Sequence, residues 1–129
     1  TETSRFDALA ISAAIESESS SLGRLRALDR ELINLSGAGP VTIRRILDAF
    51  PNGWVRRRAL VALISSGVPA SAAQALELIA ALEREVDRRW CLAALAQRGD
   101  LVGKTLEKSL ELVSSPAGRR RLQIIATRS

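Results

Sequence analysis

The stretch LSGAGPVTIRRIL, residues 35–47, interrupts a chain that otherwise reads as a series of amphipathic helices. It contains two glycines and a proline, and leucines with helical spacing precede it. Glycine ends helices readily because it tolerates positive φ, and Pro40 suits a first helical turn, where its missing N–H costs nothing. The stretch therefore predicts that one helix ends near Leu35 and the next begins at Pro40.

Apolar residues with helical spacing continue on both sides, and no segment alternates with period two. The residues before the stretch recur at steps of three or four: Leu22, Leu25, Leu28, Leu32 and Leu35. We expect the first three helices over residues 5–16, 22–35 and 40–50. The next three are expected to run from a cap at Asn52 to Gly67, from the VPAS segment through Val86, and from a cap at Asp87 to Gly99. The last two are expected over residues 102–113 and from SSP onward, the latter with Leu122 and Ile125 buried. The polar run of residues 16–21 is expected to be a break.

This pattern predicts an all-α fold, a compact array of about eight short helices joined by short turns. Residues 1–129 are long enough for a single domain with its own core, in which residues 1–21 are a candidate mobile N-terminal helical arm.

Two features repeat along the chain. The pattern Leu-x-x-Leu-x-x-x-Gly occurs three times, beginning at Leu32, Leu60 and Leu92. Arginine pairs recur every 32 residues, at positions 56–57, 88–89 and 120–121. Stacked two-helix units of this length resemble HEAT-like or other αα-repeat proteins. In a chain so rich in Leu and Arg, chance is the competing explanation.

The composition excludes several classes of function. The chain has no His and a single Cys, Cys91. It therefore lacks the clustered ligands of most metal sites, a partner for an internal disulfide, and the residues of a Ser-His-Asp or Cys-His triad. No apolar run approaches the roughly 18 residues of a membrane span, and no basic-then-apolar leader precedes the first helix. We expect a cytoplasmic protein without catalytic residues, metal, cofactor or membrane contact, in which Cys91 is a small buried hydrophobe.

The charge is positive and unevenly distributed. The net charge is +5, and 17 of the 19 basic residues are Arg. Residues 1–42 carry 4 Arg and 6 acidic residues, whereas residues 43–129 carry 15 basic and 8 acidic residues. Arg is the side chain best suited to phosphate, because its planar fork matches phosphate geometry. A GC-rich coding sequence would also enrich Arg, and composition does not choose between the two.

Residues 32–50, LINLSGAGPVTIRRILDAF, resemble the helix–hairpin–helix motif of DNA repair and recombination proteins. Leu32 and Leu35 match its first helix, residues 37–39 its Gly-apolar-Gly hairpin, and Thr42, Ile46 and Leu47 its second helix. The resemblance implies that backbone N–H groups of the hairpin bind a DNA phosphate without reading bases. The implied site residues are Gly37, Gly39 and Val41 as backbone donors, with Arg44 and Arg45 as cations.

This chain departs from the motif in three places. Ser36 stands where Pro is frequent, Ile43 where a small residue is frequent, and Val41 where Lys or Arg is common. A helix N-terminus still offers unpaired N–H groups and the positive end of a dipole to an anion. The alternative is a purely structural corner, in which glycine ends the first helix and no ligand binds.

Two arginine clusters provide a second candidate site. Each lies in or just after the first turn of an expected helix, where a cation opposes the helix dipole. The clusters are Arg56, Arg57 and Arg58, and Arg119, Arg120 and Arg121. If these arginines bind an anion, the binding explains why cations occupy this position. If they instead pair with nearby acids, as Arg88 or Arg89 could with Glu85, their role is structural. Trp54 and Trp90 adjoin arginines and are either base-stacking platforms or part of the core.

The sequence therefore favours a non-enzymatic DNA-binding protein that holds the phosphate backbone with little sequence preference, DNA being favoured over RNA. If so, the protein is nucleoid-associated. The rival hypotheses are a helical-repeat adaptor for an acidic protein partner, a homo-oligomer, and a small subunit of a larger assembly.

Overall fold

The computed structural model of the chain describes residues 5–128. Within them, the chain forms eight α-helices, one 3₁₀ helix and no strand, which confirms the all-α prediction. The elements are α1 (Arg5–Glu16), α2 (Ser21–Glu31), η1 (Leu32–Leu35), α3 (Pro40–Asp48), α4 (Trp54–Ser65), α5 (Ala72–Ala80), α6 (Glu85–Gln97), α7 (Gly103–Glu111) and α8 (Pro116–Arg128). No helix within the described range is long and apolar enough to cross a membrane.

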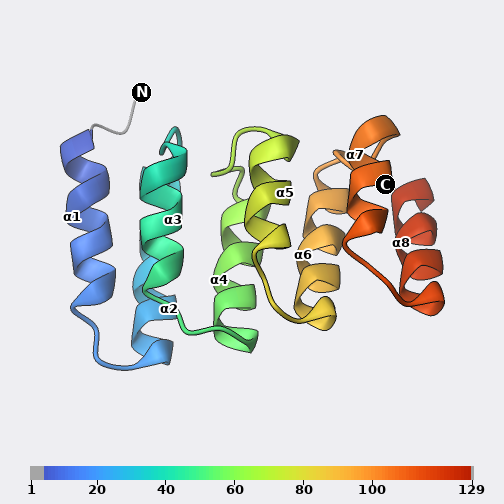
Figure 1. Ribbon diagram of the computed structural model, residues 1–129. Coiled ribbons are helices and arrows are strands. Elements are labelled where there is room, and N and C mark those ends of the chain that lie inside the picture. The colour runs from blue at the N-terminus through green and yellow to red at the C-terminus, as the bar shows by residue number, and fades with distance from the viewer. Residues whose placement is uncertain (1–4, 129) are drawn as a thin grey trace.

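The helices form two layers of stacked antiparallel pairs. The even-numbered helices pack in the order α2, α4, α6, α8, and the odd-numbered helices cover them on one side. In Figure 1, α3 and α5 pass in front of α2 and α4. Turns within a pair lie at the lower edge of this view, and turns between pairs lie at the upper edge. We call the two sets the even layer and the odd layer.

The turns between pairs have the chemistry expected of helix ends. Gly37, Gly67 and Gly99 follow α2–η1, α4 and α6, and each has a positive φ, between 75° and 85°. After each of these two helices, the N–H that follows the glycine bonds to a carbonyl five residues earlier, from Val68 to Leu63 at 3.0 Å after α4 and from Asp100 to Leu95 at 3.3 Å after α6. These are the bonds of the Schellman motif, which satisfies carbonyl groups at a helix end. The predicted helix ends at Gly67 and Gly99 are therefore correct.

Two predicted helix starts are wrong. Asn52 does not cap α4, because its side chain donates to Glu83 Oε1 at 3.2 Å and the N-cap is Gly53, with φ of 111°. Asp87 does not cap α6, which begins two residues earlier, so Asp87 lies inside the first turn.

The helix expected to run through Val86 is shorter. α5 ends at Ala80, so Leu82 and Val86 do not lie on its apolar face. Leu82 is nevertheless buried, in the turn to α6, because its side chain joins the core from there.

The core runs continuously between the layers. Leu28, Leu60 and Leu92 are fully buried and occupy positions 32 residues apart in three even-layer helices. At the N-terminal end, α1 buries Ile11 and Ile15 against α2 and α3. Fully buried apolar side chains contribute about 1.5–3 kcal/mol each.

Cys91 is also fully buried, as predicted. Burial, together with the nearby negative charge of Asp87, raises the pKa of its thiol to about 12.

Candidate nucleic-acid interface

Three arginines at the lower edge of the even layer bind backbone carbonyl groups and so hold neighbouring segments together. Arg24, Arg88 and Arg119 each donate to the carbonyl group six residues earlier, at 2.8 Å in every case. Their positions in α2, α6 and α8 are equivalent, and Arg56 has the same position in α4, because the spacings are 32, 32 and 31 residues.

The same side chains reach the ends of odd-layer helices. Arg24 bonds to the carbonyl of Ala49 at the C-terminus of α3, and Arg88 bonds to Leu112 at the C-terminus of α7, at 2.8 Å. A helix C-terminus carries unpaired carbonyls and the negative end of the dipole. A cation in the first turn of an even helix is therefore stabilised by the C-terminus of an antiparallel neighbour. For these residues the internal partner accounts for the placement without an external anion.

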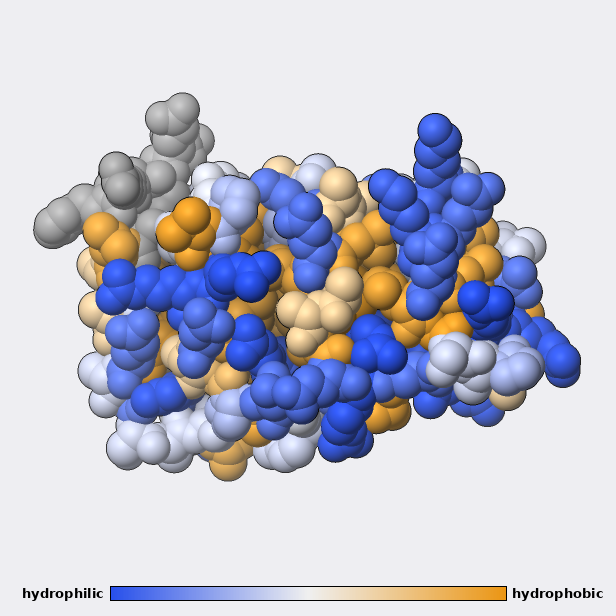
Figure 2. Space-filling view, viewed as in Figure 1, coloured by the Kyte–Doolittle hydropathy of each residue, from blue (hydrophilic) through white to orange (hydrophobic). Residues whose placement is uncertain are grey.

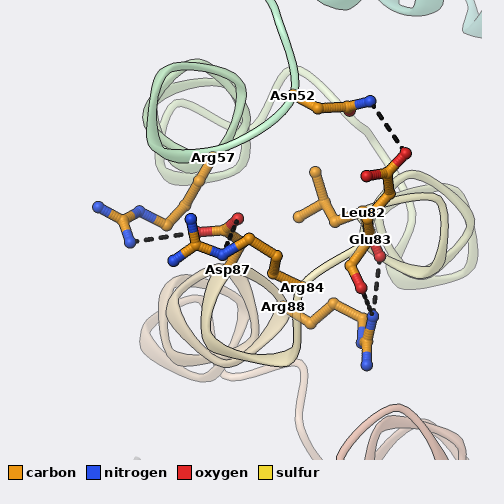
Figure 3. Close-up of polar contacts among 7 residues, drawn as sticks. All are labelled: Asn52, Arg57, Leu82, Glu83, Arg84, Asp87 and Arg88. Atoms are coloured by element: carbon orange, nitrogen blue, oxygen red, sulfur yellow. Dashed lines mark hydrogen bonds and ion pairs between the residues drawn. The ribbon is translucent and has the colours of Figure 1, made fainter.

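Two predicted site residues of α4, Arg56 and Arg57, have internal acidic partners. Arg56 pairs with Asp48 at 3.1 Å. Arg57 pairs at 3.2 Å with Asp87, whose side chain is only 2% exposed, and Arg84 approaches the other oxygen of Asp87 at 3.7 Å. Figure 3 shows both arginines converging on this carboxylate. A buried carboxylate of this kind requires paired charges, so Arg57 has a structural role.

The pairing of Glu85 with Arg88 or Arg89, considered as the alternative to an anion site, is absent among the described residues. Glu85 accepts from the N–H and hydroxyl groups of Ser114, at 2.5 and 2.7 Å, and from the N–H of Ser115, at 3.3 Å. These hydrogen bonds, above all that of the Ser114 hydroxyl, lower the pKa of Glu85 from 4.5 to about 2. Glu85 thereby joins α6 to the start of α8.

A row of exposed side chains crosses the outer face of the even layer. Its members are Arg26, Arg58, Trp90 and Arg121, one on each even-numbered helix. They lie two residues after the equivalent positions Arg24, Arg56, Arg88 and Arg119. All four are exposed, and the three arginines have no hydrogen-bond or ion-pair partner within residues 5–128. Adjacent packed helices lie about 8–10 Å apart, so the row spans about 25–30 Å. We call these four residues the Arg–Trp row.

Charge is segregated between the layers. The four even-numbered helices carry 12 Arg and 4 acidic residues, a net charge of +8. The four odd-numbered helices carry 5 basic and 6 acidic residues, a net charge of −1. Figure 2, viewed as Figure 1, shows hydrophilic and hydrophobic residues mixed on the near face. A polyanion would therefore be attracted to the even layer.

The hairpin lies at the opposite edge from the arginine clusters. Its turn is at the upper edge in Figure 1, whereas α4 and α8 begin at the lower edge. The 12 residues of α4 alone separate these edges by about 18 Å. Arg45 of α3 pairs with Glu16 at 3.4 Å, and Arg44 is exposed without a partner in the described part of the chain. The structure therefore does not combine the two predicted sites into one.

The hairpin itself is open to solvent. Gly37, Gly39 and Val41 are exposed, and a Cβ at either glycine would meet nothing within 4 Å. Positive φ occurs at Gly37, at 85°, whereas Gly39 has φ of −77° and forms the N-cap of α3. Backbone approach to this turn is thus unobstructed, and equivalent glycine turns follow α4 and α6.

A groove of about 340 Å³ lies between α6 and α8. It is lined by Val86, Arg89, Trp90, Ala93, Gly118, Arg121, Leu122 and Ile125. The Nε–H of Arg89, one of the lining residues, is buried without a hydrogen-bond partner in the described structure. An unsatisfied buried donor costs about 1–3 kcal/mol, so this arrangement calls for an explanation.

The structure divides the predicted cluster residues into two groups. Arg56, Arg57 and Arg119 have internal partners, whereas Arg58, Arg120 and Arg121 are exposed without one among residues 5–128. Arg26 and Arg89 were not among the predicted site residues. The 32-residue spacing was the available signal, since it relates Arg26 to Arg58 and Arg57 to Arg89.

Among the described residues, no group of three or more His, Cys, Asp or Glu side chains could hold a metal ion. Comparison with known protein families, with curated proteins and with solved structures finds no match to this chain.

Proposed function

We propose that this protein is a non-enzymatic DNA-binding protein that holds the phosphate backbone on the outer face of its even layer. The observation that carries the proposal is the Arg–Trp row, whose arginines are exposed and internally unpaired in the described structure. A layer with a net charge of +8 lies behind it, opposite a layer of −1. Arginines placed in this way bind phosphates without reading bases.

The hairpin would make a second, separate contact with the DNA backbone. Its exposed backbone and the first turn of α3 offer N–H groups to a phosphate, with Arg44 beside them. Because it lies at the far edge of the layers, it would contact a different stretch of the backbone from the clusters of α4 and α8.

Three double variants separate these contacts, and each removes two positive charges. Arg58→Ala with Arg121→Ala alters the even layer, Arg44→Ala with Arg45→Ala alters the hairpin, and Lys104→Ala with Lys108→Ala is the control on α7 of the odd layer. Binding to random-sequence duplex DNA is measured by fluorescence anisotropy over a series of salt concentrations. Melting temperatures establish that each variant is folded.

For the parent protein, log affinity should fall linearly with log salt, by about 0.9 for each phosphate contact. The even-layer variant should bind more weakly, with a salt slope shallower by about 2, and the odd-layer control should resemble the parent. A weaker hairpin variant would add the turn to the interface. Equal losses in all three variants would indicate unspecific charge attraction and contradict a defined surface.

The second candidate function is an adaptor for an acidic protein partner. The specific observation in its favour is the exposure of Leu22, Trp54 and Trp90 on even-layer helices, at 57%, 50% and 58%. Exposed aromatic side chains beside arginines are typical of protein interfaces. A parent protein that binds no DNA at low salt would exclude DNA binding and favour the adaptor.

A further inference from the structure

The α6–α8 groove offers hydrogen-bond donors and no side-chain acceptor. Its polar lining side chains are Arg89, Trp90 and Arg121, which carry hydrogen-bond donors and no acceptor. The rest of the lining is aliphatic or glycine. A ligand that fits must therefore bring acceptors, negative charge and an apolar face. An extended peptide fits poorly, because its own N–H groups would lack acceptors inside the groove.

Arg89 is held in the groove by close packing. A Cβ on Gly118 would lie 3.1 Å from Arg89 Cδ, so the absence of a side chain at residue 118 makes room for the arginine. The buried Nε–H of Arg89 has no partner in the described structure. The side chain is thus restrained by packing at Cδ, and its positive charge lies at the groove, where an anion would neutralise it.

Trp90 is fixed from the other side. The guanidinium of Arg57 lies 5.1 Å from the centre of the indole ring, and Arg57 is itself held by Asp87. Trp90 as a whole residue is still 58% exposed, and it also lines the groove. A rigid, half-exposed indole beside two arginines is a stacking platform for a planar base.

The volume of the groove sets the size of the ligand. About 340 Å³ is close to the lower limit of ligand pockets, which span about 300–1,000 Å³. It fits one planar group with its attached anion. A base within a duplex is stacked and paired and cannot enter, whereas a base of a single strand can.

We propose that the α6–α8 groove binds one unpaired nucleotide of single-stranded DNA, with the base against Trp90 and its phosphate on Arg89 and Arg121. This inference rests on the proposed function and adds to it a preference for single strands. The remaining arginines of the Arg–Trp row then bind the neighbouring phosphates of the strand.

The test compares three labelled probes at one salt concentration. They are oligo(dT) of about 12 nucleotides, which is unpaired and presents base carbonyl acceptors, a duplex of equal length, and poly-glutamate as a peptide polyanion. The variants are Trp90→Leu and Arg89→Gln. Arg120→Gln is the matched control, because it removes one charge from the even layer outside the groove.

Trp90→Leu should weaken oligo(dT) binding by about 5- to 150-fold, the range measured for loss of one stacked base. Arg89→Gln should weaken it by at least about 5-fold, and more than Arg120→Gln does. For the duplex, Arg89→Gln and Arg120→Gln should have equal effects. In a Trp54→Phe background the fluorescence of Trp90 should be quenched by oligo(dT) and not by the duplex.

Each other result has a defined meaning. If the groove variants weaken duplex and oligo(dT) equally, the nucleotide site is refuted while the proposed function stands. If the parent binds neither nucleic acid, both fail. If poly-glutamate binds, and Arg89→Gln weakens that binding more than Arg120→Gln does, the groove is a protein-docking site and the inference is overturned. Circular dichroism melting excludes unfolding, and failure of Trp90→Leu to fold leaves Arg89→Gln and the quenching experiment to decide.

Discussion

Replacing Asp87 with Ala should destabilise the protein far more than removing an exposed acid. The Asp87 side chain is 2% exposed and holds Arg57, which is 23% exposed, and Arg84, which is 61% exposed. Breaking a fully buried ion pair costs about 3–5 kcal/mol. Because both arginines here retain contact with water, we expect about 2–3 kcal/mol.

That loss corresponds to a large shift in melting temperature. An unfolding entropy of about 2.1 cal/mol/K per residue makes 1 kcal/mol equivalent to about 4 °C for a chain of this length. Asp87→Ala should therefore lower the melting temperature by about 7–11 °C, measured by circular dichroism at neutral pH. Coincident transitions by circular dichroism and tryptophan fluorescence would establish that unfolding is cooperative.

Asp48→Ala is the matched control, because Asp48 also pairs with an even-layer arginine, Arg56, but is 63% exposed. Exposed pairs contribute about 0–1 kcal/mol, so its melting temperature should change by less than about 4 °C. Equal shifts for the two variants would refute the structural role assigned to Asp87. Arg57→Ala should lose more stability than Trp90→Leu does, because Arg57 contacts both Asp87 and the Trp90 ring. Equal losses for these two variants would also refute the structural role.

Three further predictions concern the hydrogen bonds of Glu85, the packing at Gly118 and the carbonyl bonds of Arg88. Glu85 has a pKa lowered from 4.5 to about 2, so its stabilising effect is complete above pH 4.5 and lost as the pH falls toward 2. The melting-temperature difference between Glu85→Gln and the parent should shrink over that interval, and a constant difference would contradict the assignment. Gly118→Ala should cost about 1–3 kcal/mol in urea unfolding, because its Cβ would meet two side-chain atoms at 2.6 and 2.8 Å. Gly39→Ala, in open space at φ of −77°, should change stability by less than about 1 kcal/mol, and equal costs would refute the packing argument. Arg88→Lys should cost about 1–2 kcal/mol, since an ammonium cannot reproduce bonds to three carbonyls, whereas Arg58→Lys should change stability by less than about 0.5 kcal/mol.

Local sequence determined the helices and most of their ends. Gly67 and Gly99 end α4 and α6, and Pro40 begins α3, because these residues act through their own backbone conformation. Asn52 and Asp87 were misassigned as caps because each satisfies a partner about 30 residues away instead. A local pattern carries no information on such a partner.

The division of the arginines was decided by tertiary structure alone. Arg57 and Arg58 are neighbours in sequence, yet the first faces a buried carboxylate of α6 and the second faces solvent. Successive residues point about 100° apart around a helix, so the packing of α4 against α6 determines which of them is exposed. The same packing aligns Arg58 with Arg26 and Arg121 and leaves the hairpin at the other edge. Composition established that the chain is basic, whereas only the stacking of the even layer gathers that charge on one face.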